Sequence, residues 1–162
     1  MKNIMLSNVK FLIRSIPFTA IIFIPTIFSC QKTEPCLVAD RTAVKSEDLS
    51  APNNGVLVLQ NVNDSNEVSL IIDNQNDYQK FVKSSTTLPV IDFANHILVA
   101  GRKKWHQCIK FQDQQLTEGC DKVYYHINLS EMDCEALSHY DFFAIIGSEY
   151  GNRKIEFQIN VQ

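Results

Sequence analysis

The sequence predicts a mainly β domain of the α+β class, an antiparallel sandwich or open barrel of about seven strands with one packed helix. Three observations lead to this prediction. From residue 55 onward, apolar and polar residues alternate with a period of two in most segments. Clusters of Asn, Asp, Ser and Gly separate these segments, as is typical of turns. One segment carries a clear apolar stripe at helical spacing.

The first predicted strands come directly after residue 55. Residues 56–59 form a short apolar run, and residues 68–72 alternate between apolar and polar or smaller side chains. The stretch between them, residues 61–66, is rich in Asn, Asp and Ser, which favours a hairpin loop. A later run, residues 97–101, is almost wholly apolar, which predicts a strand at the centre of a sheet.

A helix is predicted between these strands, over residues 74–84. Tyr78, Phe81 and Val82 fall at positions i, i+3 and i+4 and therefore share one helical face. The Asp-Asn pair before them provides a cap for the first turn. A second, single-turn helix is predicted over residues 131–138, because the Ser-Glu-Met-Asp sequence at its start is typical of a helix cap.

Four further strands follow the central one. In the first of them, residues 105, 107, 109 and 111 share one face, and all but Gln107 are apolar or aromatic. In the second, the apolar and aromatic residues 123, 125, 127 and 129 share one face. The Thr-Glu-Gly turn at residues 117–119 joins them as a hairpin. Residues 142–146 are apolar on both faces and should be buried. The last strand, residues 154–161, alternates between apolar residues (Ile, Phe, Ile and Val) and polar residues. One of its faces should therefore be exposed to solvent.

The N-terminal segment predicts export. Lys2, Lys10 and Arg14 precede an apolar run of residues 15–28, the order of a secretory signal peptide. The run is too short for a membrane span, which needs about 20 residues. We therefore expect residues 1–29 to be a signal peptide, residues 30–54 a lipidated tether, and residues 55–162 a single β-rich domain.

The end of this segment, Ile-Phe-Ser-Cys, resembles the lipobox of bacterial lipoproteins. The resemblance implies that Cys30 is lipidated and becomes the mature N-terminus, so that the lipid holds the protein on a membrane. The Gln-Lys-Thr-Glu sequence that follows resembles the tag of surface-exposed lipoproteins in Gram-negative bacteria. These likenesses imply the cell envelope, and the outer membrane in particular, with the domain facing the periplasm or exposed on the surface.

A second resemblance covers roughly residues 55–105. Asp77, Tyr78 and Phe81, then Pro-Val-Ile-Asp-Phe at residues 89–93 and Leu-Val-Ala-Gly at residues 98–101, resemble a recurring opening of small Gram-negative lipoproteins of the Bacteroidetes type. Some of these look like the β domain of a protease-complex regulatory subunit, an all-β non-catalytic module. The resemblance implies a fold of that kind, and no site residues transfer with it.

Charge argues against a nucleic-acid partner. The formal net charge of the chain is −3, and removal of the signal peptide leaves 12 basic and 18 acidic residues. An acidic domain repels a phosphate backbone. The basic run of Arg102, Lys103 and Lys104 is too short to make a polyanion site.

The cysteines predict disulfides. With Cys30 used for lipid, four remain, and an exported chain with an even number of cysteines favours one or two bonds. The candidates are Cys36, Cys108, Cys120 and Cys134. Three pairings are open if all four join, and Cys36 could attach the tether to the domain. The alternative is one bond with two free thiols.

Metal or thiol chemistry is the competing interpretation. His106, Cys108 and His126 lie on neighbouring predicted strands and on one face, and two imidazoles with a thiolate can bind zinc. Cys108 is better explained as half of a disulfide, and the chain has no close-spaced ligand motif. We therefore predict no metal, no cofactor and no catalytic residue.

Recognition is the favoured role. Arg102, Lys103, Lys104, Trp105 and Tyr124 are candidates for a recognition patch, because Arg and aromatic residues dominate interface hot spots. We therefore expect a membrane-anchored lipoprotein that is a non-catalytic binding or accessory module for a protein or glycan. The alternatives are an inhibitor or regulatory subunit of an extracellular hydrolase, and a small metal- or thiol-dependent enzyme.

Overall fold

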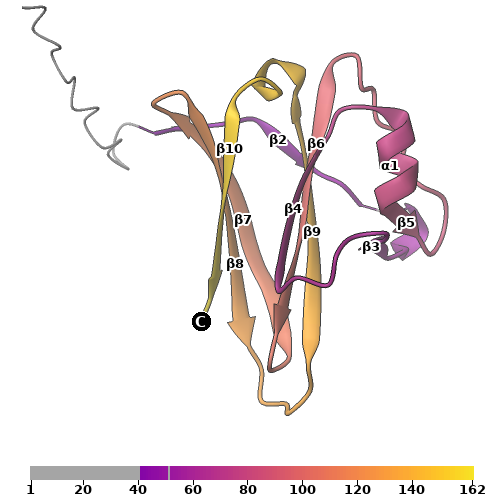
Figure 1. The fold of residues 1–162 in the computed structure, drawn as a ribbon, viewed down its shortest axis with the longest axis vertical. Helices are drawn as coiled ribbons and strands as arrows, with labels where there is room; N and C mark the ends of the chain where they lie inside the picture. Colours follow the sequence, from indigo (N-terminus) through magenta and orange to yellow (C-terminus); the bar gives the residue numbers. More distant parts are fainter. Residues whose placement is uncertain (1–40, 51) are drawn as a thin grey trace, which may run out of the picture. The chain divides into compact units, whose positions relative to one another are not determined.

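The computed structural model describes residues 41–50 and 52–162, which belong to one compact unit, Pro35–Gln162. This part of the chain contains ten strands and one short α-helix, so the predicted mainly β class is confirmed. Two four-stranded sheets and one two-stranded sheet hold the strands (Figure 1). No sheet among the described residues closes into a barrel, and the two larger sheets pack on each other as a sandwich.

The sheets draw on strands from distant parts of the sequence. Sheet A has the order β1 (Thr42–Ala43), β7 (Ile109–Gly119), β8 (Lys122–Glu131) and β10 (Lys154–Val161). Sheet B has the order β2 (Ser46–Asp48), β9 (Ser138–Gly147), β6 (His96–Trp105) and β4 (Glu67–Ile72). In the small sheet, β3 (Leu57–Leu59) pairs with β5 (Val82–Ser84). The helix α1 spans Gln75–Phe81, and two 3-10 turns, η2 (Pro52–Asn54) and η3 (Ser148–Tyr150), complete the elements.

The main core lies between sheets A and B. Its aromatic centre joins both sheets, because Tyr125 of β8 lies 5.6 Å from the ring centroid of Phe142 of β9 and 5.6 Å from that of Phe157 of β10. Gly101 of β6 leaves the space that the Phe142 ring occupies, since a Cβ at this position would meet that ring and the carbonyl oxygen of Val68. The inward rows predicted for residues 123–129 and 155–161 both contribute to this core.

A second core covers the other face of sheet B. Leu98 of β6, Phe143 of β9 and Ile72 of β4 pack there with Tyr78 of α1 and Val82 of β5. Burial raises the pKa of Tyr78 to about 12, and its hydroxyl donates a hydrogen bond to a backbone carbonyl oxygen. Sheet B is therefore the middle layer, which explains why β6 and β9 are apolar on both faces, as predicted.

The predicted helix is confirmed, although it is shorter than expected. The side chain of Asn74 caps α1 by accepting a hydrogen bond of 2.9 Å from the backbone N–H of Asp77. The helix ends at Phe81 because Val82 adopts an extended backbone, with φ −116° and ψ 133°, and begins β5. Residues 82–84, which the helical periodicity placed in the last turn of the helix, therefore pair with β3 instead.

Part of the segment predicted as tether pairs with the β sandwich. Residues 42–48 belong to the sandwich, because β1 pairs with β7 in sheet A and β2 pairs with β9 in sheet B. Between them, Val44 is buried in the main core and its N–H donates 2.9 Å to the carbonyl oxygen of Leu116. The polar composition of this segment concealed it, because short edge strands need few apolar side chains.

The hairpin of β7 and β8 is confirmed, but its turn lies further along the chain than predicted. Gly119 pairs with Lys122, so the loop consists of Cys120 and Asp121, whose φ angles are 48° and 65°. Two successive positive φ values define a type I′ turn, whose twist matches that of the strands. The predicted turn residues, 117–119, are the end of β7 instead.

Three other expectations are wrong. The strand predicted to start at residue 105 is interrupted, because β6 ends at Trp105 and β7 begins at Ile109. Residues 132–137 contain no helix. The sheet is not wholly antiparallel, since β10 runs parallel to β8. Consecutive strands such as β9 and β10 lie in different sheets, so the hairpin rule does not determine their direction.

Candidate functional site

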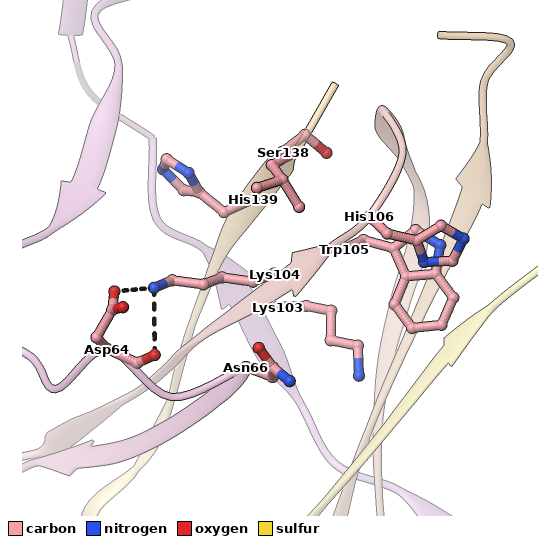
Figure 2. Close-up of a pocket in the computed structure, with 9 residues that line it drawn as sticks. Asp64, Asn66, Lys103, Lys104, Trp105, His106, Ser138 and His139 are labelled. Carbon is pink, nitrogen blue, oxygen red and sulfur yellow. Dashed lines mark hydrogen bonds and ion pairs between the residues drawn. The ribbon is translucent and has the colours of Figure 1, made fainter. Parts of the chain in front are cut away.

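An open groove with a volume of about 560 Å³ lies where β6 ends (Figure 2). Three segments far apart in the sequence line it: the loop before β4, the end of β6 with the turn after it, and the start of β9. The lining residues are Asp64, Asn66, Lys103, Lys104, Trp105, His106, Leu137, Ser138 and His139. The groove therefore combines one large aromatic ring with hydrogen-bonding and ionisable side chains.

Acidic neighbours hold the two lysines of the groove. Lys103 forms an ion pair with Glu67 of β4, and its Nζ lies 5.1 Å from the centroid of the Trp105 ring. Lys104 forms an ion pair with Asp64, and this contact lowers the pKa of the Asp64 carboxyl group. The Asp64 side chain is fully exposed, so water competes for this pair and the Lys104 ammonium is available to a ligand.

Trp105 is anchored at its polar end. Its indole Nε1 donates a hydrogen bond of 2.6 Å to the Glu131 carboxylate at the end of β8. The Trp105 ring also lies close to the His106 ring, with 4.9 Å between the ring centroids. The indole is thus held in one orientation between the two sheets, and part of its surface remains accessible in the groove.

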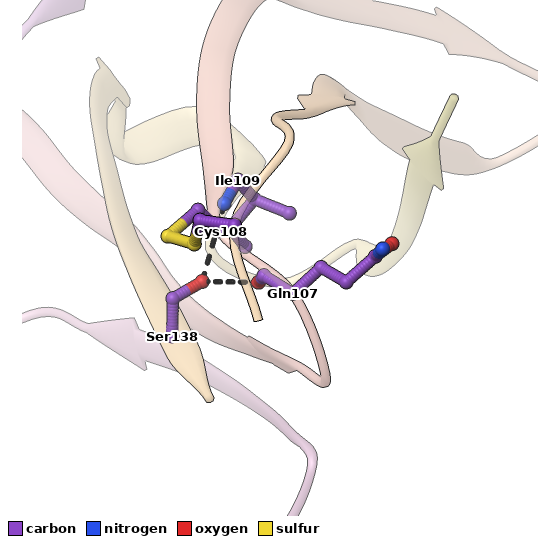
Figure 3. Close-up of a disulfide and its surroundings, with 5 residues drawn as sticks. Gln107, Cys108, Ile109 and Ser138 are labelled. Carbon is purple, nitrogen blue, oxygen red and sulfur yellow. Dashed lines mark hydrogen bonds between the residues drawn. A yellow bond between two sulfur atoms is a disulfide. The ribbon is translucent and has the colours of Figure 1, made fainter. Parts of the chain in front are cut away.

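Two covalent and polar links brace the loops around the groove (Figure 3). Cys108 and Cys134 form a disulfide with a Cα–Cα distance of 5.5 Å. The Ser138 hydroxyl donates 2.6 Å to the Gln107 carbonyl oxygen and accepts 3.2 Å from the Ile109 N–H. These links hold the turn of residues 106–108 against the loop of residues 132–137, so both walls of the groove are pre-organised.

The five predicted patch residues do not form one surface. Lys103, Lys104 and Trp105 line the groove, whereas Arg102 and Tyr124 lie elsewhere. Arg102 points into the second core, where its guanidinium holds Asp141 at 2.6 and 2.8 Å and donates 2.7 Å to the Leu59 carbonyl oxygen. Side chains alternate along β6, so Arg102 shares a face with Lys104 and lies opposite Lys103 and Trp105, and only the residues near the end of the strand reach the groove.

Tyr124 belongs to the outer face of sheet A. The guanidinium of Arg41 lies 3.5 Å above the centroid of its ring, and one Arg41 nitrogen is 3.4 Å from Nε2 of His126. Tyr124 and His126 also stack, with their ring centroids 6.4 Å apart. This cluster explains why Tyr124 is buried although it faces outward.

His126 makes the stability of the fold depend on pH. Burial and the nearby charge of Arg41 lower the pKa of its imidazole below the usual 6.5. Below pH 6.5 the unfolded chain therefore binds this proton before the folded chain does, and the free energy of unfolding falls. We expect His126→Gln to flatten the decline in stability between pH 7.5 and 5.5, measured by urea denaturation.

The matched control for this prediction is Gln158→Ala. Gln158 is the register partner of His126 on β10, so the change disturbs the same surface without removing a titrating group. The control should retain the pH dependence of the unaltered chain. Identical slopes for His126→Gln and the unaltered protein would contradict the prediction.

The candidate metal ligands are not brought together. Cys108 is in the disulfide, His106 lies in the groove, and His126 lies on the outer face of sheet A. Within residues 41–50 and 52–162 there is no cluster of three or more His, Cys, Asp or Glu side chains that could hold a metal ion. A disulfide-bonded sulfur is also neither a thiolate ligand nor a nucleophile.

The disulfide prediction is confirmed for Cys108 and Cys134, and Cys120 is disulfide-bonded as well. The expectations for Cys30 and Cys36, lipidation and attachment of the tether, fall outside the described residues. No helix in the described part of the chain is long and apolar enough to cross a bilayer.

Sequence reasoning missed most of the groove. Asp64, Leu137 and His139 belong to segments that no motif connects, and only the sheet order places them beside β6. One signal was available, because Leu137 is a large apolar residue in a polar loop, and it is 88% exposed. Comparison with known proteins adds no relative: no family model, curated protein or solved structure matches this chain.

Proposed function

We propose that this protein is a lipid-anchored, non-catalytic binding module of the outer membrane that holds a glycan in the Trp105 groove. The observation that carries the proposal is the groove itself, an open site that one indole ring lines together with lysine, histidine and asparagine side chains. A sugar ring offers an apolar face for an indole and hydroxyl groups for such polar partners. The lipobox-like Cys30 supports the membrane anchor.

The ionisable side chains favour an acidic glycan. Lys104 has only a fully exposed partner, Asp64, and an ammonium in such a pair can exchange that partner for a carboxylate of the ligand. His106 and His139 add hydrogen-bonding nitrogens to the same groove. The bracing disulfide keeps the loops in place before binding, which lowers the entropic cost of association.

The distribution of reactive groups supports a non-catalytic role. Ser138 in the groove is engaged in two backbone hydrogen bonds, so its hydroxyl serves the structure of the loops. Cys108 contributes a disulfide sulfur, and His126 faces a different surface. The residues that a thiol- or metal-dependent enzyme would need, His106, Cys108 and His126, thus lie in separate parts of the fold.

The single tryptophan of the chain makes the proposal directly testable. We expect uronic-acid oligosaccharides to change the tryptophan emission of the full-length protein in detergent, with a saturable dependence on concentration. Neutral oligosaccharides of equal length should bind more weakly. Lys104→Ala should weaken binding of the acidic ligand at least tenfold, which corresponds to about 1.4 kcal/mol.

Two further variants complete this experiment. Tyr124→Phe on the outer face of sheet A should leave the titration unchanged, and Trp105→Ala should abolish binding measured by calorimetry. A flat emission signal with every acidic and neutral oligosaccharide would contradict the glycan proposal.

A second candidate is an accessory subunit that binds another protein. Met132 and Leu137 are exposed large apolar side chains in the loop between β8 and β9, which the disulfide holds in place. Rigid, exposed apolar residues are typical of protein contacts. Loss of a co-purifying envelope protein in Leu137→Ser, with glycan binding absent, would favour this candidate.

A further inference from the structure

The last strand forms an open edge of sheet A. In the part of the chain that the structure describes, β10 has β8 on one side and no strand on the other. Its pairing runs from Lys154 opposite Lys122 to Val161 opposite Leu129 without any register shift. The edge is therefore regular over its whole length, which is the condition for adding another strand.

The backbone groups of this edge can be assigned from the hydrogen bonds at its end. The N–H of Gln162 donates 3.0 Å to the Leu129 carbonyl oxygen, and the Gln162 carbonyl accepts 2.7 Å from the Glu131 N–H. Backbone groups alternate in direction along a strand, so residues 154, 156, 158 and 160 also face β8. Residues 155, 157, 159 and 161 consequently direct their N–H and C=O groups to the open edge.

The side chains of those same four residues point into the sandwich. They pack against the main core and are only partly buried, so apolar surface lies directly beside the unpaired backbone groups. An added strand would satisfy the backbone groups and cover this surface at once.

The other outer strands carry features that discourage pairing. β1 and β2 have two and three residues, which is too short for a stable ladder. β4 directs Glu67, which is 55% exposed, toward the same side as the main core. Inward charges and short length are common protections of sheet edges. β10 has no proline, no bulge and no inward charge, so it is the least protected edge of the two four-stranded sheets.

We propose that β10 pairs antiparallel with β10 of a second copy of this chain, with Gln158 facing Gln158 across the two-fold axis. This register places Phe157 opposite Ile159 and uses all four outward-facing residues of each copy, which makes about eight hydrogen bonds. The two four-stranded sheets then join into one continuous sheet. This inference goes beyond the proposed function and does not depend on the groove.

The polar face of β10 favours this register. The Glu156 carboxylate is already paired with Lys122 and accepts a hydrogen bond from the Gln158 amide of its own strand. In this register it faces the neutral Asn160, and the Gln158 amide oxygen faces a second amide that can donate to it. A register centred on Glu156 would place two carboxylates directly opposite each other, which is destabilising. A register centred on Phe157 would use fewer of the outward-facing residues within the strand.

Cysteine cross-linking in intact cells that produce the full chain tests the proposal. Gln158→Cys should give a disulfide-linked dimer under mild oxidation, seen on a non-reducing gel, in more than half of the chains. Asn160→Cys should give less than a tenth as much, because in this register the two Asn160 positions are about 13 Å apart along the strands. The unaltered chain measures the background from its own cysteines.

Mixing the variants checks the register independently. Glu156→Cys and Asn160→Cys chains, produced together, should cross-link to each other more than either does alone. Equal cross-linking of Gln158→Cys and Asn160→Cys would show random collision and overturn the proposal. A Gln158→Cys product with a different chain mass would assign the edge to another protein and would also overturn it.

Discussion

Arg102→Ala should destabilise the fold by about 3–5 kcal/mol, the range for breaking a buried ion pair by removal of one partner. The side chains of Arg102 and Asp141 are 14% and 4% exposed, so the carboxylate that remains would be nearly buried without its cation. It would keep only the hydrogen bond of 2.8 Å from the Leu59 N–H. Urea denaturation monitored by circular dichroism measures the loss.

Two variants separate the ion pair from general packing. Arg102→Met with Asp141→Leu removes both charges and should recover much of the lost stability, because neither group is then left unpaired. Lys104→Ala removes the next cation on the same face of β6, whose partner is fully exposed, and should leave the denaturation midpoint unchanged. Similar losses for Arg102→Ala and Lys104→Ala would contradict the structural role of Arg102.

Loss of the disulfide is expected to cost about 3 kcal/mol. Cys108 and Cys134 are 26 residues apart in sequence, and closing a loop of that length restricts the unfolded chain. Cys108→Ser with Cys134→Ser should lower the free energy of unfolding by this amount, measured in urea without reductant. The disulfide should matter more than the bridge made by the Ser138 hydroxyl, whose hydrogen bonds each contribute about 1 kcal/mol.

The same variant tests whether the disulfide organises the groove. If it does, glycan binding should weaken in the double serine variant at temperatures where the domain is still folded. Ser138→Ala removes the polar link between the same two loops and leaves the covalent link, so it should weaken binding less than the double serine variant does. Unchanged binding and unchanged stability in the double serine variant would contradict both roles of the disulfide.

Local sequence patterns predicted the strands that are buried evenly along their length, either on one face or on both. The strict alternation of residues 154–161 predicted a strand with one row packed on the core, and β10 is that strand. The apolar runs at residues 97–101 and 142–146 predicted central strands, and β6 and β9 are the two inner strands of sheet B. Burial on one face leaves a period of two in the sequence, and burial on both faces leaves an unbroken apolar run, so both features can be read from one segment alone.

The sequence also predicted that a disulfide forms, but it did not predict which cysteines pair. The expected export and the clustered cysteines predict disulfide bonds, and the bond between Cys108 and Cys134 confirms this prediction. Which cysteines pair was left open, because four cysteines can form two bonds in three different ways. It is decided by the approach of the turn after β6 to the loop after β8, which brings the two Cα atoms within 5.5 Å.

The sequence by itself determined the β class, the packed helix over residues 75–81 and the central strands, because each is a periodic or compositional property of one segment. Only the tertiary structure decided that β10 runs parallel to β8, that Arg102 pairs with Asp141 and that Trp105 and His139 line one groove. These contacts join residues far apart in sequence. They depend on which sheet each strand enters and in which register, and no local pattern records either choice.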